Sequence, residues 1–266
     1  MKRLLCLLLP VLLLAGCAKD LPEEPAPTEP QWKTVYVHSS ISYNSGGVSN
    51  RTDYCYDANN HLTDVIVSDA EGKQLHRYLV ECDEHGNPIE WASAAGTTVN
   101  YTYDAQVRTL KTETYNGELF MTSTEYNWSG DLRISTTVKT PSQENRLEYT
   151  YDETGKLTRQ DMYENGQLRN YGLYTLGEDG KPVLCSHYDA AGTLTATVTY
   201  EYLENQETRT TADAQGKVTM TNILTYDPQG NLLSEEHLDG SGATLSLEVH
   251  EWIPLEVAID VPRASI

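Results

Sequence analysis

The chain has 266 residues, of which 39 are acidic and 19 basic, so its formal net charge is −20 at pH 7. A surface this acidic repels phosphate backbones, which excludes nucleic acid as an expected partner. The length allows one or two ordinary domains, or a single long repeat array.

Residues 1–16 have the pattern of a signal peptide. A basic start at Lys2 and Arg3 precedes an apolar run, Leu4–Leu14, which is too short to span a membrane comfortably as a helix. The sequence Leu14–Cys17 resembles a bacterial lipobox, in which the cysteine is acylated and becomes the new N-terminus. An ordinary secretory signal is the alternative. We expect lipidation at Cys17, which would place the protein at the bacterial cell envelope, anchored in a membrane and facing outside the cytoplasm.

Residues 17–31 are predicted to be a linker between this anchor and a folded domain. They contain four prolines among Glu and Thr, a composition that cannot bury enough apolar surface to fold and that favours an extended spacer. Acyl chains on the cysteine would each contribute about 0.8 kcal/mol of membrane affinity per buried methylene. Removing residues 1–16 takes away two basic groups and no acids, so the charge of −20 becomes −22.

A tyrosine signature recurs through residues 32–255 at intervals of roughly two dozen residues. Its clearest copies are Tyr54–Asp57, Tyr101–Asp104, Tyr149–Asp152 and Leu224–Asp227. Most copies continue into a turn with Gly or Asn and then an aliphatic residue, as in Asp152–Leu157. Self-similarity at such a period is typical of an array that stacks one small unit, so we predict a single repeat domain over residues 32–255 and a short tail over 256–266.

Between signatures the chain alternates with period two, as in Ala196–Tyr202 and Leu245–His250. Alternation that is rich in β-branched and aromatic residues predicts strands with one buried and one wet face. Glycine-centred turns such as Asn116–Gly117 separate the strands. Each period therefore holds two strands and two turns, and the predicted fold is all-β: an antiparallel meander of about sixteen strands.

The repeated Tyr-x-Tyr-Asp-x-x-Gly-x-Leu pattern resembles the YD repeat of rearrangement-hot-spot (RHS) proteins, and Tyr163–Leu168 also resembles a MORN-type repeat. The RHS resemblance implies a shell around a toxin only in much longer chains. It also implies an Asp-Pro-x-Gly-Leu ending, whereas Asp227–Gly230 is followed here by Asn231 and another ordinary repeat. We therefore expect a short member without a toxin domain.

A sheet with one apolar face must hide that face, and long open sheets tend to curl. We expect a twisted sheet curved into a solenoid-like or rolled form, with the tyrosines inside the curve. An outer-membrane barrel needs strands that are apolar outside. The outward residues here are Thr, Glu and Arg and the mean hydropathy is −0.51, which argues against such a barrel.

Eighteen tyrosines and four tryptophans invite a ligand-binding interpretation, because their rings suit the apolar faces of sugars while carboxylates bind the hydroxyls. Most of these aromatics follow the repeat, so we interpret them as cross-strand pairs that stabilise the sheet. Trp91, Tyr115 and Tyr188 fall outside the repeat pattern and are the predicted ligand-binding residues.

Three cysteines, Cys55, Cys82 and Cys185, remain after the signal and the anchor are set aside. The repeat register puts Cys82 on a tyrosine position and Cys55 one residue away from one. Neighbouring strand residues point to opposite faces, so we expect no disulfide between these two.

No motif points to catalysis. The seven histidines form no His-Glu-x-x-His pair or zinc-spaced cluster, and no nucleophile elbow or phosphate loop occurs. Asp57–Asn60 could suggest a calcium-binding loop, but the series of calcium ligands is incomplete, so we interpret this segment as a simple turn. We expect a protein that is not an enzyme and needs no metal and no cofactor. The leading hypothesis is a binding or scaffolding module whose partners are the membrane and an envelope protein or polysaccharide. A carbohydrate-binding surface protein and a hydrolase with its active site in the loops are the alternatives.

Overall fold

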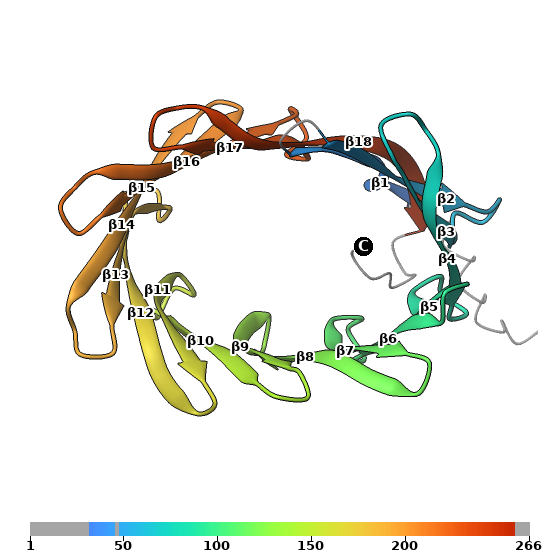
Figure 1. Cartoon of the computed structure of the whole chain (residues 1–266), viewed down its shortest axis with the longest axis horizontal. Coiled ribbons are helices and arrows are strands. Elements are labelled where there is room, and N and C mark those ends of the chain that lie inside the picture. Colours follow the sequence, from blue (N-terminus) through green and yellow to red (C-terminus); the bar gives the residue numbers. More distant parts are fainter. Residues whose placement is uncertain (1–31, 46–47, 259–266) are drawn as a thin grey trace, which may run out of the picture.

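A computed structural model describes residues 32–45 and 48–258, which form a ring of eighteen antiparallel strands (Figure 1). No helix within these ranges is long and apolar enough to cross a membrane. The strands are β1 (Trp32–Ser45), β2 (Val48–Tyr56), β3 (Leu62–Ser68), β4 (Gln74–Cys82), β5 (Pro88–Ser93), β6 (Thr97–Tyr103), β7 (Thr109–Asn116), β8 (Leu119–Ser129), β9 (Leu132–Lys139), β10 (Glu144–Tyr151), β11 (Leu157–Glu164), β12 (Gln167–Leu176), β13 (Pro182–Asp189), β14 (Leu194–Leu203), β15 (Gln206–Asp213), β16 (Val218–Tyr226), β17 (Leu232–Asp239) and β18 (Thr244–Ala258).

The aspartate of the signature builds the turns. The Asp152 carboxylate accepts hydrogen bonds from the amides of Thr154 at 2.8 Å and Lys156 at 2.9 Å, while Gly155 takes a φ of +80°. These bonds, above all that from Lys156, hold the pKa of Asp152 below its usual range. The left-handed φ is one that glycine adopts without strain, which explains the Asp-x-x-Gly spacing. The same pair of bonds recurs at Asp57, Asp69, Asp83, Asp104, Asp189, Asp213, Asp227 and Asp239.

The sheet closes on itself. Each strand pairs with the next along the chain, and β18 pairs with β1 from Trp32 opposite Ala258 to Ser45 opposite Ser246. The described residues therefore form a closed eighteen-stranded β-barrel. The predicted all-β antiparallel meander is confirmed, whereas the prediction of a solenoid-like or rolled sheet is wrong, and there are eighteen strands where about sixteen are predicted. Closure satisfies the backbone groups of both sheet edges, which an open sheet would leave unpaired.

The wall has two chemically different faces. Residues opposite one another across strands share a face, so the register defines a tyrosine face that carries the signature aromatics, for example Tyr54 opposite Val65 and Val65 opposite Tyr78. Cys82, opposite Pro88, lies on this face, whereas Cys55, opposite Asp64, lies on the other. The prediction that these two cysteines point to opposite sides is confirmed, and both are free thiols.

The tyrosine face is the inner one. Among the residues whose burial is described, all five buried hydrophobic ones lie on it by register, whereas Leu79, Leu173 and Val249 are exposed on the other face. Side chains converge and shield one another on the concave side of a curved wall, and they diverge on the convex side. This difference assigns the tyrosine face to the lumen. The five residues are Ile41, Leu62, Val65, Cys185 and Leu224.

The second aromatic residue of the signature forms a hydrogen bond to the neighbouring strand. The hydroxyl of Tyr56 donates to the carbonyl of His38 at 2.9 Å, and that of Tyr103 donates to the carbonyl of Pro88 at 2.8 Å. Trp252 donates its indole N–H to the carbonyl of Leu232 at 2.7 Å. An aromatic ring with a polar tip therefore suits this position, because it fills the wall and satisfies a carbonyl of the preceding strand.

Candidate functional site

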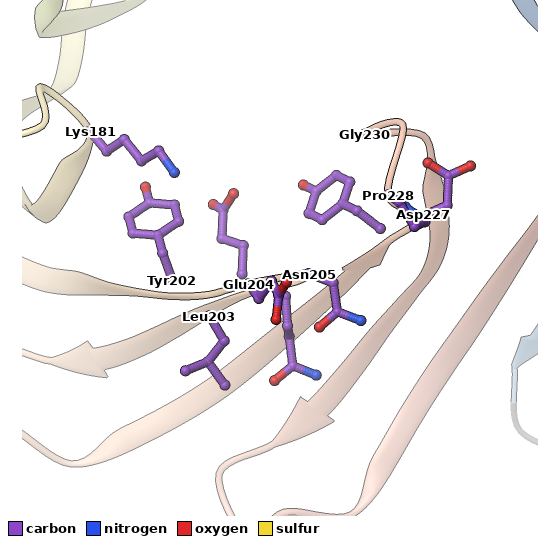
Figure 2. Close-up of a pocket in the computed structure, with 11 residues that line it drawn as sticks. Lys181, Tyr202, Leu203, Glu204, Asn205, Asp227, Pro228 and Gly230 are labelled. Atoms are coloured by element: carbon purple, nitrogen blue, oxygen red, sulfur yellow. The ribbon is translucent and has the colours of Figure 1, made fainter.

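A groove opens on the barrel where one turn of the repeat is short. After Tyr202 the chain reverses within Leu203–Gln206, whose end residues pair directly. Its neighbours at the same end of the barrel are longer: Asp227 and Asn231 close one such turn, and Gly177 and Lys181 close the other. The short turn leaves a space of 810 Å³ between them, which we call the Tyr202 groove (Figure 2).

Two tyrosine rings and several polar groups line this groove. Tyr202 lies opposite Glu207 in the register, and Tyr226 ends the next hairpin. The Nζ atom of Lys181 lies 4.7 Å from the centroid of the Tyr202 ring, a cation–π contact. Figure 2 shows Lys181 on the same side of the wall as Tyr202, while Leu203 points the other way. The groove thus combines flat apolar surfaces with charges of both signs.

The surroundings of Glu207 and of the two tyrosines define part of the electrostatics of the groove. Glu207 accepts a hydrogen bond from Nε of Arg209 at 2.6 Å and is mostly shielded from solvent. Burial, followed by the nearby Glu207 carboxylate, raises the pKa of Tyr202 and of Tyr226. Both phenols therefore stay protonated at neutral pH and can donate as well as accept hydrogen bonds. Within the described part of the chain, Lys181 has no carboxylate within ion-pair distance.

The predicted ligand-binding residues lie elsewhere and are not brought together. Trp91, on β5, belongs to the tyrosine face, where its ring centroid lies 6.4 Å from that of Tyr78 and 5.9 Å from that of Tyr101. Tyr115, on β7, and Tyr188, on β13, lie on the outer face. Tyr115 contacts Phe120 edge-on at 5.8 Å, and Tyr188 stacks on Tyr171 at 5.1 Å. None of the three lines the Tyr202 groove.

The sequence does carry one signal for the groove. The hairpin after Tyr202 reads Leu203–Gln206, where the complete repeats have Asp-x-x-Gly, so this turn has lost its aspartate and its glycine. A shortened turn between longer neighbours predicts a gap at the end of the barrel. Tyr202 and Tyr226 follow the repeat, which is why the repeat pattern alone assigns them to the sheet rather than to a site.

The lumen also holds a cysteine beside a histidine. Sγ of Cys185 lies 3.5 Å from Nε2 of His187, close to Gly172. Burial raises the pKa of the Cys185 thiol and lowers that of His187, so both groups are neutral at neutral pH. A nucleophilic cysteine needs the opposite pattern, a thiolate beside an imidazolium. Among the described residues no group of three or more His, Cys, Asp or Glu side chains is placed to hold a metal ion.

The predicted anchor lies outside the described residues. This applies to the signal peptide over 1–16, to Cys17, to the linker over 17–31 and to the last residues of the predicted tail, 259–266.

No protein-family model matches the sequence, and no curated protein matches it. Among solved structures the chain is similar to TcdB2-TccC3, with 13% identity and a TM-score of 0.37 over 80% of this chain and 16% of that chain. It is also similar to a porin-like protein from Bacteroides uniformis, with 12% identity and a TM-score of 0.45 over 81% of this chain and 98% of that chain. A porin-like protein from Bacteroides vulgatus has 11% identity and a TM-score of 0.39 over 83% of this chain and 100% of that chain.

Proposed function

We propose that the protein is a lipid-anchored binding module at the bacterial cell envelope and that the Tyr202 groove binds carbohydrate. The observation that carries the proposal is the groove itself, in which two tyrosine rings lie beside the carboxylate of Glu207 and the ammonium of Lys181. The proposed location at the cell envelope rests on the lipobox at Leu14–Cys17 and on the proline-rich spacer that follows it. The tyrosine motif supports kinship with short RHS-type repeat proteins.

The chemistry of the groove fits a sugar better than an apolar ligand. Sugar rings offer flat C–H surfaces that stack on tyrosine, and their hydroxyls need partners that both donate and accept. The protonated phenols, the Glu207 carboxylate and the side-chain amides of Asn205 and Gln206 supply both. Binding sites of this kind combine aromatic surface with a few polar groups that fix orientation. An open groove also lets a longer polysaccharide continue beyond the sugars that it contacts.

The test is a glycan array probed with the full chain in detergent, followed by calorimetry on the glycans that bind. Tyr202→Ala should lower the affinity at least tenfold, because the loss of one stacking surface and its hydroxyl removes on the order of 1.4 kcal/mol or more. Glu207→Gln should weaken binding as well.

Tyr151→Ala is the matched control. Tyr151 occupies the same position of the signature, beside the long turn of Asp152, and does not line the groove. Thermal unfolding of both variants establishes that they fold. An array without signal, or equal loss of affinity in the Tyr202 and Tyr151 variants, would contradict the proposal.

A further inference from the structure

A second pocket lies beside another short turn of the barrel. The signature aromatics of β8 are Tyr126 and Trp128, and the chain then reverses within Ser129–Leu132, again without Asp-x-x-Gly. A space of 400 Å³ opens here, lined by both aromatics together with Arg108 and Arg133. We call it the Arg133 pocket. It lies at β8 and β9, whereas the Tyr202 groove lies at β14 and β15, so the two sites are independent.

The first arginine of this pocket is already neutralised. Nε of Arg108 donates to Oδ2 of Asp104 at 2.7 Å, and Nη2 lies 2.6 Å from the same oxygen. Nη1 donates to the carbonyl of Gly130. The guanidinium lies 5.2 Å from the centroid of the Trp128 ring. Arg108 and Asp104 therefore form a fixed, locally neutral side of the pocket.

The second arginine has no such partner. Eight arginines lie within the described ranges, and seven of them have a carboxylate within 4.0 Å; the exception is Arg133. Its guanidinium lies 5.9 Å from the Tyr126 ring and 5.2 Å from the Tyr149 ring, contacts that come from the strands on either side of it. In a chain of net charge −20, a guanidinium held between rings and not paired with an acid is unusual.

We propose that the Arg133 pocket binds an oxyanion, the carboxylate or sulfate group of a ligand. A guanidinium presents its N–H donors in a planar fork that matches two oxygens of such a group. The guanidinium lies 5.9 Å and 5.2 Å from the centroids of the two flanking rings, and none of its N–H groups donates a hydrogen bond to a described residue. Partial removal of water strengthens a charge-assisted bond. A free inorganic anion and an acidic sugar share this chemistry.

The experiment titrates the full chain in detergent with sodium glucuronate, glucose and sodium sulfate at constant ionic strength. Calorimetry gives the affinities, and the NMR signal of the arginine Nε–H groups reports which arginine responds. Glucuronate should bind at least tenfold more tightly than glucose, because hydrogen bonds to charged groups exceed those to neutral ones by about that factor. Sulfate binding that displaces glucuronate would show that the pocket recognises the anion itself. Glucuronate binding that sulfate does not displace would show that it recognises an acidic sugar.

Arg133→Gln removes the charge and keeps a polar, though shorter, side chain, so it should reduce glucuronate binding to the level of glucose. Arg146→Gln is the matched control. Arg146 also stacks on a tyrosine, Tyr163 at 4.8 Å, but it is paired with Glu148 at 3.2 Å. The Arg146→Gln substitution changes the net charge by the same amount as Arg133→Gln. Equal losses in the two variants, unchanged binding in Arg133→Gln, or no preference for glucuronate over glucose would each overturn the proposal. Sugar binding in the Tyr202 groove would survive all three outcomes.

Discussion

Nε2 of His38 and Nδ1 of His250 share a hydrogen bond of 3.2 Å across the seam where β1 meets β18. The His38 ring stacks on Trp252 with centroids 3.9 Å apart and on Tyr54 at 5.7 Å. His250 is buried, and its other nitrogen lies 3.4 Å from the Glu248 carboxylate without forming a hydrogen bond to it. The closing strands of the barrel are therefore joined through a pair of imidazoles.

This pair should make the barrel sensitive to acid. Burial, with the nearby His250, lowers the pKa of His38 from 6.5 to about 4. Between these values the unfolded chain binds a proton that the folded chain does not, so stability is lost as the pH falls through this window. Thermal unfolding of the wild type should show a lower midpoint at pH 5 than at pH 7.

His38→Gln should make that dependence shallower, because the amide can replace Nε2 as a hydrogen-bonding group without titrating. All other ionisable groups are common to both proteins, so only the difference between the two pH profiles is informative. Parallel profiles would show that the seam does not sense pH.

Gly86 should tolerate a side chain less well than Gly72. Both glycines have positive φ, +82° and +80°, so alanine strains the backbone at either position by roughly 1–2 kcal/mol. A Cβ on Gly86 would also meet Cδ2 of His61 at 2.5 Å, whereas nothing lies within 4 Å at Gly72. In urea titrations, Gly86→Ala should lower the free energy of unfolding by roughly 1 kcal/mol more than Gly72→Ala does. Equal effects would mean that the His61 ring moves aside without cost.

The hydroxyl of Tyr103 should contribute measurably to stability. Tyr103→Phe removes its hydrogen bond to the carbonyl of Pro88, which should lower the free energy of unfolding by about 1 kcal/mol. Tyr101→Phe is the control, since Tyr101 stacks on Tyr103 at 6.5 Å and its hydroxyl has no hydrogen-bond partner among the described residues. Chemical denaturation of both variants makes the comparison. A loss in the control as large as that in Tyr103→Phe would assign the effect to packing.

Lipidation at Cys17 can be tested in cells. Cys17→Ala should move the protein from the membrane fraction to the soluble fraction, because stable anchoring depends on its acyl chains. Mass spectrometry of the mature N-terminus gives an independent readout. Unchanged fractionation, or an N-terminal peptide without acyl chains, would remove the anchor from the proposed function.

The strands and turns of this barrel can be predicted from the sequence, because the interactions that form them join residues only a few positions apart. Period-two alternation predicts strands such as β14, and each Asp-x-x-Gly turn is made by bonds between residues two and four apart, as at Asp152. Closure has no local cause. It depends on Trp32 lying opposite Ala258, a pairing that follows only when the twist of all the hairpins is summed.

The two pockets also depend on relationships between residues that are far apart in the sequence. Tyr202 and Trp128 follow the repeat and therefore look structural, and they line open space only because Leu203–Gln206 and Ser129–Leu132 are short. Both pockets therefore lie where a turn departs from the repeat, and not where an aromatic does. Trp91, which falls outside the repeat pattern, lies on the lumen face near the rings of Tyr78 and Tyr101, and its role in ligand binding stays a prediction.

Because β1 pairs with β18, every strand of the barrel has a neighbour on both sides, including the two strands nearest the chain termini. If a short linker joined Trp32 to Ala258, new termini could be cut at an exposed turn, such as Glu204–Asn205, with every strand keeping its two neighbours. Such a circular permutant should fold to the same ring, and display platforms or sensors could be built by choosing which turn is opened.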